Sequence, residues 1–179
     1  ADAGFSPHCL GYAGVFGGPQ PTLPRLRAAM VHADAVVAHS LGGLMVLEAL
    51  RDAPELPVRR VVCLGSPLAG SAVAATLARR RMGFMCGRSG KLLSAGVPFP
   101  WSAKVQVGAI AGTSARGVGR MLGVLDGPGD GTVGVAETCW PGLSAHTTVP
   151  ASHSGLLFSR TALRQVRVFL REGEFEPAA

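Results

Sequence analysis

Apolar residues along this chain gather in short blocks that glycine, proline and polar residues separate. Two kinds of block alternate: compact apolar runs, typical of buried strands, and longer segments whose apolar residues recur on one helix face. This alternation predicts an α/β fold with a mostly parallel sheet and helices on both faces. The expected strands lie at 7–12, 34–38, 59–64, 105–111 and 132–136. The expected helices lie at 22–30, 43–51, 72–81 and 161–170, and a loop is expected at 14–21.

The segment 72–101 departs from this alternation. Beyond the helix expected to end at residue 81, glycines interrupt an apolar stretch that includes Leu92, Phe99 and Trp101. Such a stretch is typical of an extra helical layer or of a cover over a site. We therefore expect one domain, residues 1–179, in which 72–101 is a possible helical cap or lid insertion.

Composition narrows the classes of function. Hydrophobic residues make up 47% of the chain and charged residues 16%, as in a packed globular domain. The net charge is +6, but the basic residues are mostly scattered arginines without interleaved aromatics, so nucleic acid is not an expected partner. Apolar runs are too short for stable membrane insertion, and no signal peptide is visible, which favours a cytoplasmic location.

The four cysteines give no indication of a metal site or a disulfide framework. Cys9, Cys63, Cys86 and Cys139 are widely spaced, and no CxxC pair or histidine at ligand spacing accompanies them. We expect buried free thiols, and neither a metal nor an organic cofactor. Nothing in the sequence indicates the oligomeric state.

Residues 36–47, VVAHSLGGLMVL, place one hydroxyl between a predicted strand and a predicted helix. Ala38 and Gly42 flank Ser40 at two positions on either side, so the segment departs from G-x-S-x-G only at Ala38. A tight strand-to-helix turn needs small residues there because bulk would clash across it. The turn exposes the hydroxyl and directs the backbone amide of Leu41 at an oxyanion, which predicts that Ser40 is a nucleophile. The alternative is that Ser40 only caps the helix.

A serine nucleophile needs a base and a group that orients the base. GPGDGTV offers Asp130 and ASHSGLLFS offers His153, and the chain order Ser, Asp, His is associated with this kind of turn. Asp130 is favoured because the GTV after it can enter a strand that holds the carboxylate in place.

Other residues could supply the carboxylate or the base. The alternatives are Asp126, Glu137, His146 and His39. His39 directly precedes Ser40, so we expect its side chain to point away from the position of a base.

Four motifs occur in order along the chain: AHSLGG at 38–43, GSPLAGS at 65–71, GDGTV at 129–133 and HSGLL at 153–157. With these motifs the chain resembles the α/β-hydrolase fold family, and within it the lipase and esterase branch. The resemblance implies that Ser40 is the nucleophile, His153 the general base and then acid, and Asp130 the orienting carboxylate.

The resemblance also implies a reaction and a substrate class. The reaction would be hydrolysis of a small-molecule or lipid carboxylic ester through an acyl-enzyme, and the apolar residues of 82–101 favour an apolar acyl group. Ser66, Pro67 and Leu68 would border the acyl or leaving-group pocket. Acyl transfer and thioester cleavage by the same residues are alternatives, as is a binding protein that keeps the fold without turnover.

The chain departs from the family's pattern near its start. In the family, a glycine-rich loop after an upstream strand supplies the second oxyanion amide, and no such segment precedes 7–12. The opening ADAGF is typical of a helix tail closed by Gly4. We therefore expect that an N-terminal strand, loop and most of a helix are absent, which would lower the rate by about two to three orders of magnitude.

Overall fold

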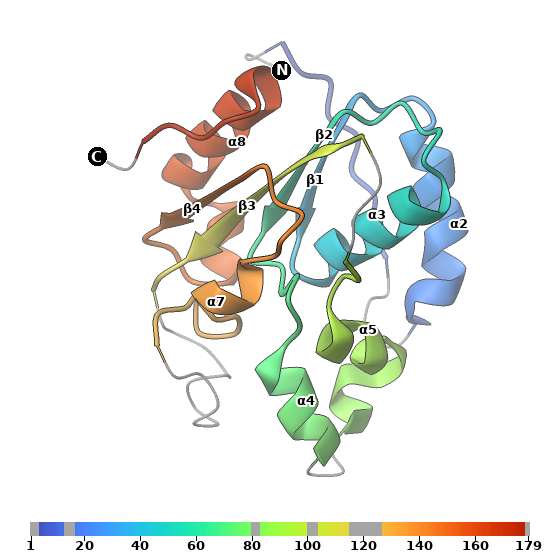
Figure 1. Cartoon of the computed structure of the whole chain (residues 1–179), viewed down its shortest axis with the longest axis vertical. Helices are drawn as coiled ribbons and strands as arrows, with labels where there is room; N and C mark the ends of the chain where they lie inside the picture. The colour runs from blue at the N-terminus through green and yellow to red at the C-terminus, as the bar shows by residue number, and fades with distance from the viewer. Residues whose placement is uncertain (1–3, 13–16, 80–82, 100–103, 115–126, 178–179) are drawn as a thin grey trace.

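A computed structural model describes residues 4–12, 17–79, 83–99, 104–114 and 127–177 (Figure 1). One parallel sheet lies at its centre, with its strands in the order β1-β2-β3-β4. These strands are β1 (Ala35–His39), β2 (Arg60–Leu64), β3 (Gln106–Gly112) and β4 (Ala145–Val149). Each strand pairs in parallel with the next along the chain. The predicted α/β fold with a parallel sheet is thus confirmed.

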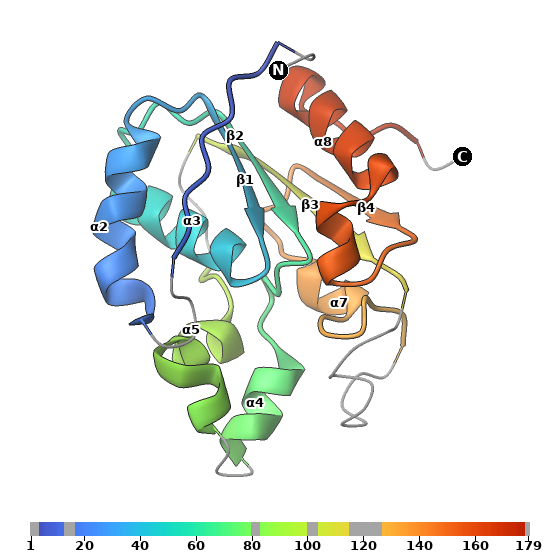
Figure 2. The same ribbon diagram turned by 180° about the vertical axis from the view of Figure 1, so that it is seen from behind.

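Helices cover both faces of the sheet (Figures 1 and 2). α3 (Leu41–Asp52) packs on β1 and β2, and α2 (Pro19–Met30) lies against α3. α8 (Arg160–Glu172) covers the opposite face. Successive strand residues point to opposite faces, so β2 supplies both cores: Val61 faces α3 and Val62 faces α8. This double burial explains why β2 reads as a continuous apolar run.

The core under α8 depends on a glycine in β3. Gly108 has no side chain, so the rings of Phe169 and Phe175 can pack directly on its backbone. A Cβ at this position would lie only 2.8 Å from each ring. Ser159 caps the start of α8, because its hydroxyl accepts a hydrogen bond from the amide of Ala162. The amphipathic helix expected at 161–170 is therefore present, and its apolar face fills the space that Gly108 leaves open.

The shorter helices lie near the ends of the strands. Their bounds are α4 (Ala72–Arg79), η1 (Gly83–Ser89), α5 (Gly90–Ala95), α7 (Val135–Thr138) and η2 (Ser154–Leu157). α4, η1 and α5 pack on one another beyond the carboxyl end of β2 (Figure 1). The indole nitrogen of Trp140 donates to the carbonyl of Val97 at 3.0 Å, which ties the end of this helical group to the main domain. A role as a cap stays a prediction, and Trp101 lies outside the described residues.

Several predicted elements were wrong. Residues 7–12 form no strand, and in the expected strand 132–136 the first three residues form a turn and the last two begin α7. The expected loop at 14–21 is wrong at residues 19–21, which open α2 because proline fits the first turn of a helix, and residues 14–16 lie outside the described part of the chain. β4 was missed, since its sequence AHTTV is only partly buried at the sheet edge and forms no apolar run.

The cysteine prediction holds in part. All four cysteines are free, but Cys9 and Cys139 are exposed and Cys86 is half-buried. Cys63 is fully buried in β2, and this burial raises the pKa of its thiol to about 12. Within the described part of the chain, no helix is long and apolar enough to cross a membrane.

Candidate active site

Ser40 occupies a sharp turn between β1 and α3. Its φ of +55° is the only positive value at a non-glycine residue in the described part of the chain. Two backbone hydrogen bonds hold this strained conformation: the amide of Ser40 donates to the carbonyl of Leu64, and the amide of Gly43 donates to the carbonyl of Ser40. The hydroxyl of Ser40 makes no capping bond to α3. The turn therefore leaves this hydroxyl available for another partner.

The small residues around Ser40 are required by close packing. A Cβ on Gly42 would lie 3.2 Å from the hydroxyl oxygen of Tyr12, and a Cβ on Gly43 would collide with the side chain of Ser66. The same Cβ on Gly42 would lie 3.7 Å from the Cβ of Ala38, an ordinary contact. Alanine at position 38 is therefore accommodated as long as position 42 stays small.

Three residues from separate loops meet at this turn. The Nε2 atom of His153 lies 2.9 Å from the Oγ of Ser40, and its Nδ1 atom lies 2.7 Å from the Oδ2 of Asp130. A carboxylate can only accept, so Nδ1 carries the proton, and Nε2 is left to accept the serine hydroxyl proton. Ser40, His153 and Asp130 thus form one continuous hydrogen-bonded line.

Asp130 is held by backbone amides rather than by a strand. Its side chain is 1% exposed, and its Oδ1 accepts hydrogen bonds from the amides of Thr132 at 2.9 Å and Val133 at 2.7 Å. The amide of His153 also donates to the carbonyl of Asp130. The expectation that GTV enters a strand was wrong, because these residues form the turn that binds Oδ1. The two amides compensate the burial of the carboxylate and leave Oδ2 facing His153.

The alternative carboxylates and bases lie in other environments. Glu137 accepts hydrogen bonds from the amides of Gly134 and Ala72, so it caps α7. The Nε2 atom of His146 lies 2.7 Å from the hydroxyl of Thr138. Asp126 lies outside the described residues. In the ranges that the structure describes, no three His, Cys, Asp or Glu side chains gather as a metal site.

His39 belongs to the site, contrary to the expectation that it points away. In the sheet it pairs with Leu64, whose side chain faces α8, and the loop that carries His153 lies on that face. The Nε2 atom of His39 lies 2.9 Å from the backbone oxygen of His153, and the two rings are 4.6 Å apart. Burial lowers the pKa of His39. The neutral ring therefore donates its single proton to the His153 carbonyl, a contact that no sequence motif signals.

For the ester hydrolysis that the sequence predicts, we expect the variant His39→Phe to lower kcat by about ten-fold with little change in KM, because the loop that carries the predicted base His153 loses an anchor. His39→Gln should restore much of kcat, since its amide nitrogen can replace Nε2 as the donor. His146→Gln is the matched control and should leave kcat unchanged. Steady-state kinetics on the three variants tests this, and equal losses for Phe and Gln would contradict the anchoring role.

Gly65 lies directly behind the pair of Asp130 and His153. Its φ is +53°, and a Cβ there would lie 2.9 Å from the Oδ2 of Asp130 and 3.2 Å from the Nδ1 of His153. The side chain of Leu156 closes the same space at 2.8 Å. Any side chain at position 65 would therefore press on the hydrogen bond that orients the base.

Gly65→Ala should lower kcat/KM by about a hundred-fold, because small displacements of reacting groups have effects of that order. It should also lower the free energy of unfolding by about 1–3 kcal/mol. Gly127→Ala is the control: its φ of +103° imposes similar backbone strain, but nothing lies within 4 Å of its Cβ position. Ester kinetics and denaturant unfolding separate the two effects, and a Gly65→Ala variant as active as Gly127→Ala would refute the steric argument.

The remaining predicted site residues differ in accessibility. Leu41 is the first residue of α3, so its amide is among those without an acceptor inside the helix. Ser66 and Leu68 are almost fully buried, and Pro67 is buried as well. Side chains buried to this degree have almost no surface to offer a substrate, so their role in binding stays a prediction.

Comparison with known proteins finds similar folds among solved structures. No family model and no curated protein matches the chain. Among solved structures, the metagenomic carboxyl esterase MGS0156 matches with a TM-score of 0.63 and 20% identity over 78% of this chain and 52% of its own. The mature lipase BlEst2 from Bacillus licheniformis matches with a TM-score of 0.59 and 20% identity over 84% and 69%.

A third match is phospholipase PlaB from Legionella pneumophila, with a TM-score of 0.55 and 15% identity over 84% of this chain and 44% of its own. This chain therefore spans about half the length of the esterase and less than half that of the phospholipase. Matches at sequence identities this low show a similarity of fold alone. The chain has an α/β fold, with a parallel sheet of four strands in its described residues, that resembles the α/β-hydrolase esterases and lipases.

Proposed function

We propose that this protein is a serine hydrolase that cleaves carboxylic esters with an apolar acyl group. The observation that carries the proposal is the hydrogen-bonded line from Asp130 through His153 to Ser40, which is positioned on a turn that does not use the serine hydroxyl as a cap. A serine with a base 2.9 Å away, itself oriented by a buried carboxylate, has the arrangement needed for nucleophilic catalysis.

The reaction proceeds in two halves. His153 Nε2 accepts the hydroxyl proton as Ser40 Oγ attacks the carbonyl carbon of the ester, and the amide of Leu41 donates to the resulting oxyanion. His153 then gives the proton to the leaving alkoxide, which departs and leaves an acyl group on Ser40. Water attacks this acyl-enzyme with the same base and releases the acid. Throughout, Asp130 stabilises the imidazolium and keeps the ring in its productive tautomer.

The preference for an apolar acyl group rests on the segment 72–101. The described helices of this segment, α4, η1 and α5, pack together beyond the carboxyl end of β2, the edge of the sheet at which parallel α/β folds bind ligands. Phe99 in this segment is 59% exposed, and its ring meets that of Trp140 edge to face at 6.4 Å. An exposed aromatic ring in this segment suits contact with an acyl chain.

Labelling and turnover test the proposal together. A fluorophosphonate probe should label the native protein and fail to label Ser40→Ala, because an unactivated serine does not react with it. p-Nitrophenyl esters from acetate to decanoate should be hydrolysed, with kcat/KM rising toward the longer chains. No labelling of the native protein would favour a non-catalytic binding protein, and ester products formed with an added alcohol would identify acyl transfer.

A further inference from the structure

The surface that follows the candidate base carries exposed apolar and basic side chains together. Leu157 is 55% exposed and Phe158 is 84% exposed, and both lie in the short segment between His153 and α8. Leu163, on the first part of α8, is 56% exposed. Large apolar side chains gathered at such exposure are typical of surfaces that contact another molecule.

Basic side chains begin two residues after Phe158, on α8. Arg160, Leu163, Arg164 and Arg167 follow the spacing i, i+3, i+4 and i+7, which places them along one side of the helix. All four are exposed, whereas the opposite side packs into the sheet. We name the α8 outer face by its members: Leu157, Phe158, Arg160, Leu163, Arg164, Arg167 and Val168.

The charge of the α8 outer face is positive. The helix carries no acidic residue between Arg160 and Leu170. Acidic residues occur only at its far end and beyond, at Glu172, Glu174 and Glu176, and Glu176 pairs with Arg164. The carboxylate of Glu176 offsets one positive charge, that of Arg164. Arg160 and Arg167 still make the first turns of the helix positively charged.

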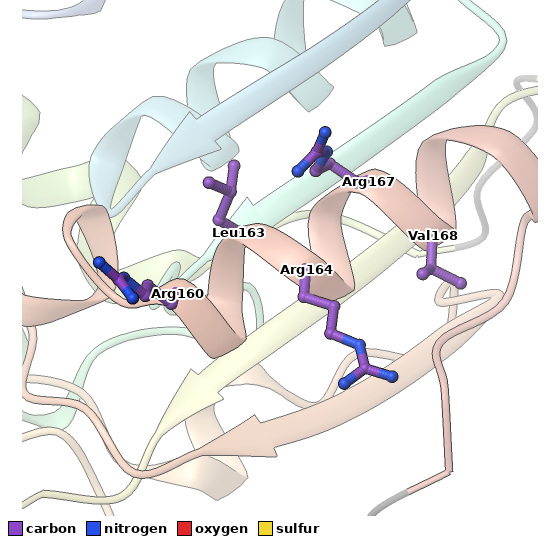
Figure 3. Close-up of a pocket in the computed structure, with 5 residues that line it drawn as sticks. All are labelled: Arg160, Leu163, Arg164, Arg167 and Val168. Carbon is purple, nitrogen blue, oxygen red and sulfur yellow. The ribbon is translucent and has the colours of Figure 1, made fainter. Parts of the chain in front are cut away.

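Figure 3 shows how these side chains are arranged. The guanidinium groups of Arg160, Arg164 and Arg167 spread away from one another along the helix instead of converging on one point. They line an open hollow of about 510 Å³ together with Leu163 and Val168. Cations that point in different directions can each contact a separate anionic group on a surface. A single phosphate would need cations that converge on it. Aliphatic side chains between them suit acyl chains, and nucleic acid offers no comparable apolar phase.

We propose that the α8 outer face binds the surface of an anionic membrane, with its arginines at the level of the lipid phosphates and Phe158 and Leu163 among the acyl chains. The arginine stems lie along apolar lipid while their heads stay at the interface. Phe158 follows His153 by five residues, so bound lipid would lie beside the loop of the candidate base. The binding itself requires no hydrolysis and goes beyond the proposed function.

Sedimentation with lipid vesicles tests this binding. All proteins carry Ser40→Ala so that the vesicles stay intact, and the vesicles contain phosphatidylcholine alone or with an equal part of phosphatidylglycerol. We expect binding to the mixed vesicles only. The triple variant Arg160→Gln, Arg164→Gln, Arg167→Gln should bind on the order of a hundred-fold more weakly, because each basic residue near an anionic surface contributes a factor of about five. Phe158→Ser with Leu163→Ser should also weaken binding, by about ten-fold or more.

A charge-matched control separates this face from the net charge. The triple variant Arg25→Gln, Arg51→Gln, Arg59→Gln removes three exposed arginines outside the α8 outer face and should bind the mixed vesicles nearly as well as the parent. Equal losses for both triple variants, no preference of the parent for anionic vesicles, or binding to duplex DNA without binding to vesicles would each overturn the proposal.

Two further measurements keep a negative result interpretable. Circular dichroism melting of the α8 variants should show an intact fold, since exposed substitutions have small effects on stability. In chains that keep Ser40, hydrolysis of soluble p-nitrophenyl acetate should be unchanged by the α8 substitutions. Loss of vesicle binding with full hydrolysis would support the lipid surface, whereas absent hydrolysis with normal vesicle binding would count against the proposed enzymatic function alone.

Discussion

Ser40→Ala should lower kcat/KM for p-nitrophenyl butyrate by about five to six orders of magnitude, a loss typical when a serine nucleophile is removed. The fold should survive, because the hydroxyl of Ser40 bonds to His153 and caps no helix. Alanine experiences about the same strain at a φ of +55°, so the free energy of unfolding should change by less than about 1 kcal/mol. Ester kinetics and urea unfolding measure the two quantities separately.

A nearby serine provides the control for this variant. Ser154 is exposed and directly follows His153, but the base bonds to Ser40 instead. Ser154→Ala should keep kcat/KM within a few-fold of the parent. If Ser40→Ala retained more than a hundredth of the parent activity while folded, the assignment of the nucleophile would be wrong.

Asp130→Asn should lower kcat by about ten-thousand-fold with little change in KM, because the substitution inverts the proton pattern of the base. The amides of Thr132 and Val133 donate to Oδ1, so the side-chain oxygen of asparagine must occupy that position. Its NH₂ group then faces His153 Nδ1 as a donor. The ring is forced to carry its proton on Nε2, where it can no longer accept the proton of Ser40. Steady-state kinetics with a short-chain ester measures the loss.

Comparison with two other carboxyl variants makes this test specific. Asp130→Ala leaves buried amides without an acceptor and should lower the free energy of unfolding by about 1–3 kcal/mol, whereas Asp130→Asn preserves those bonds. Glu137→Gln alters the cap of α7 and should change stability more than kcat. An Asp130→Asn enzyme within ten-fold of the parent would show that Asp130 does not orient the base.

The pattern of apolar residues along the chain predicted those strands and helices whose burial is regular from residue to residue. β2 is buried on both faces and reads as an unbroken apolar run, and α8 carries its apolar residues on one side. β4 has neither signal, because AHTTV lies at the edge of the sheet and Val149 is its only buried side chain. It is a strand because its backbone pairs with β3, a property of the neighbour rather than of its own residues.

The same distinction applies to the candidate site. The turn at Ser40 was predictable because small residues at fixed spacing are a local requirement of that backbone conformation. His39 was misjudged because its direction depends on the register with Leu64, and Gly65 was missed because its reason for being glycine is a contact with Asp130 and His153. Neither register nor contact leaves a periodic mark in a single sequence.

By itself, then, the sequence determined the alternation of strands and helices and the strained turn that presents Ser40, since both arise from interactions between residues close together in the chain. Only the tertiary structure decided which partners reach that turn. Ser40 and His153 are 113 residues apart, and they lie within 2.9 Å because parallel pairing brings the carboxyl ends of the strands to one edge of the sheet. Hydrogen bonds from the amides of Thr132 and Val133 then fix the direction in which Asp130 faces the base.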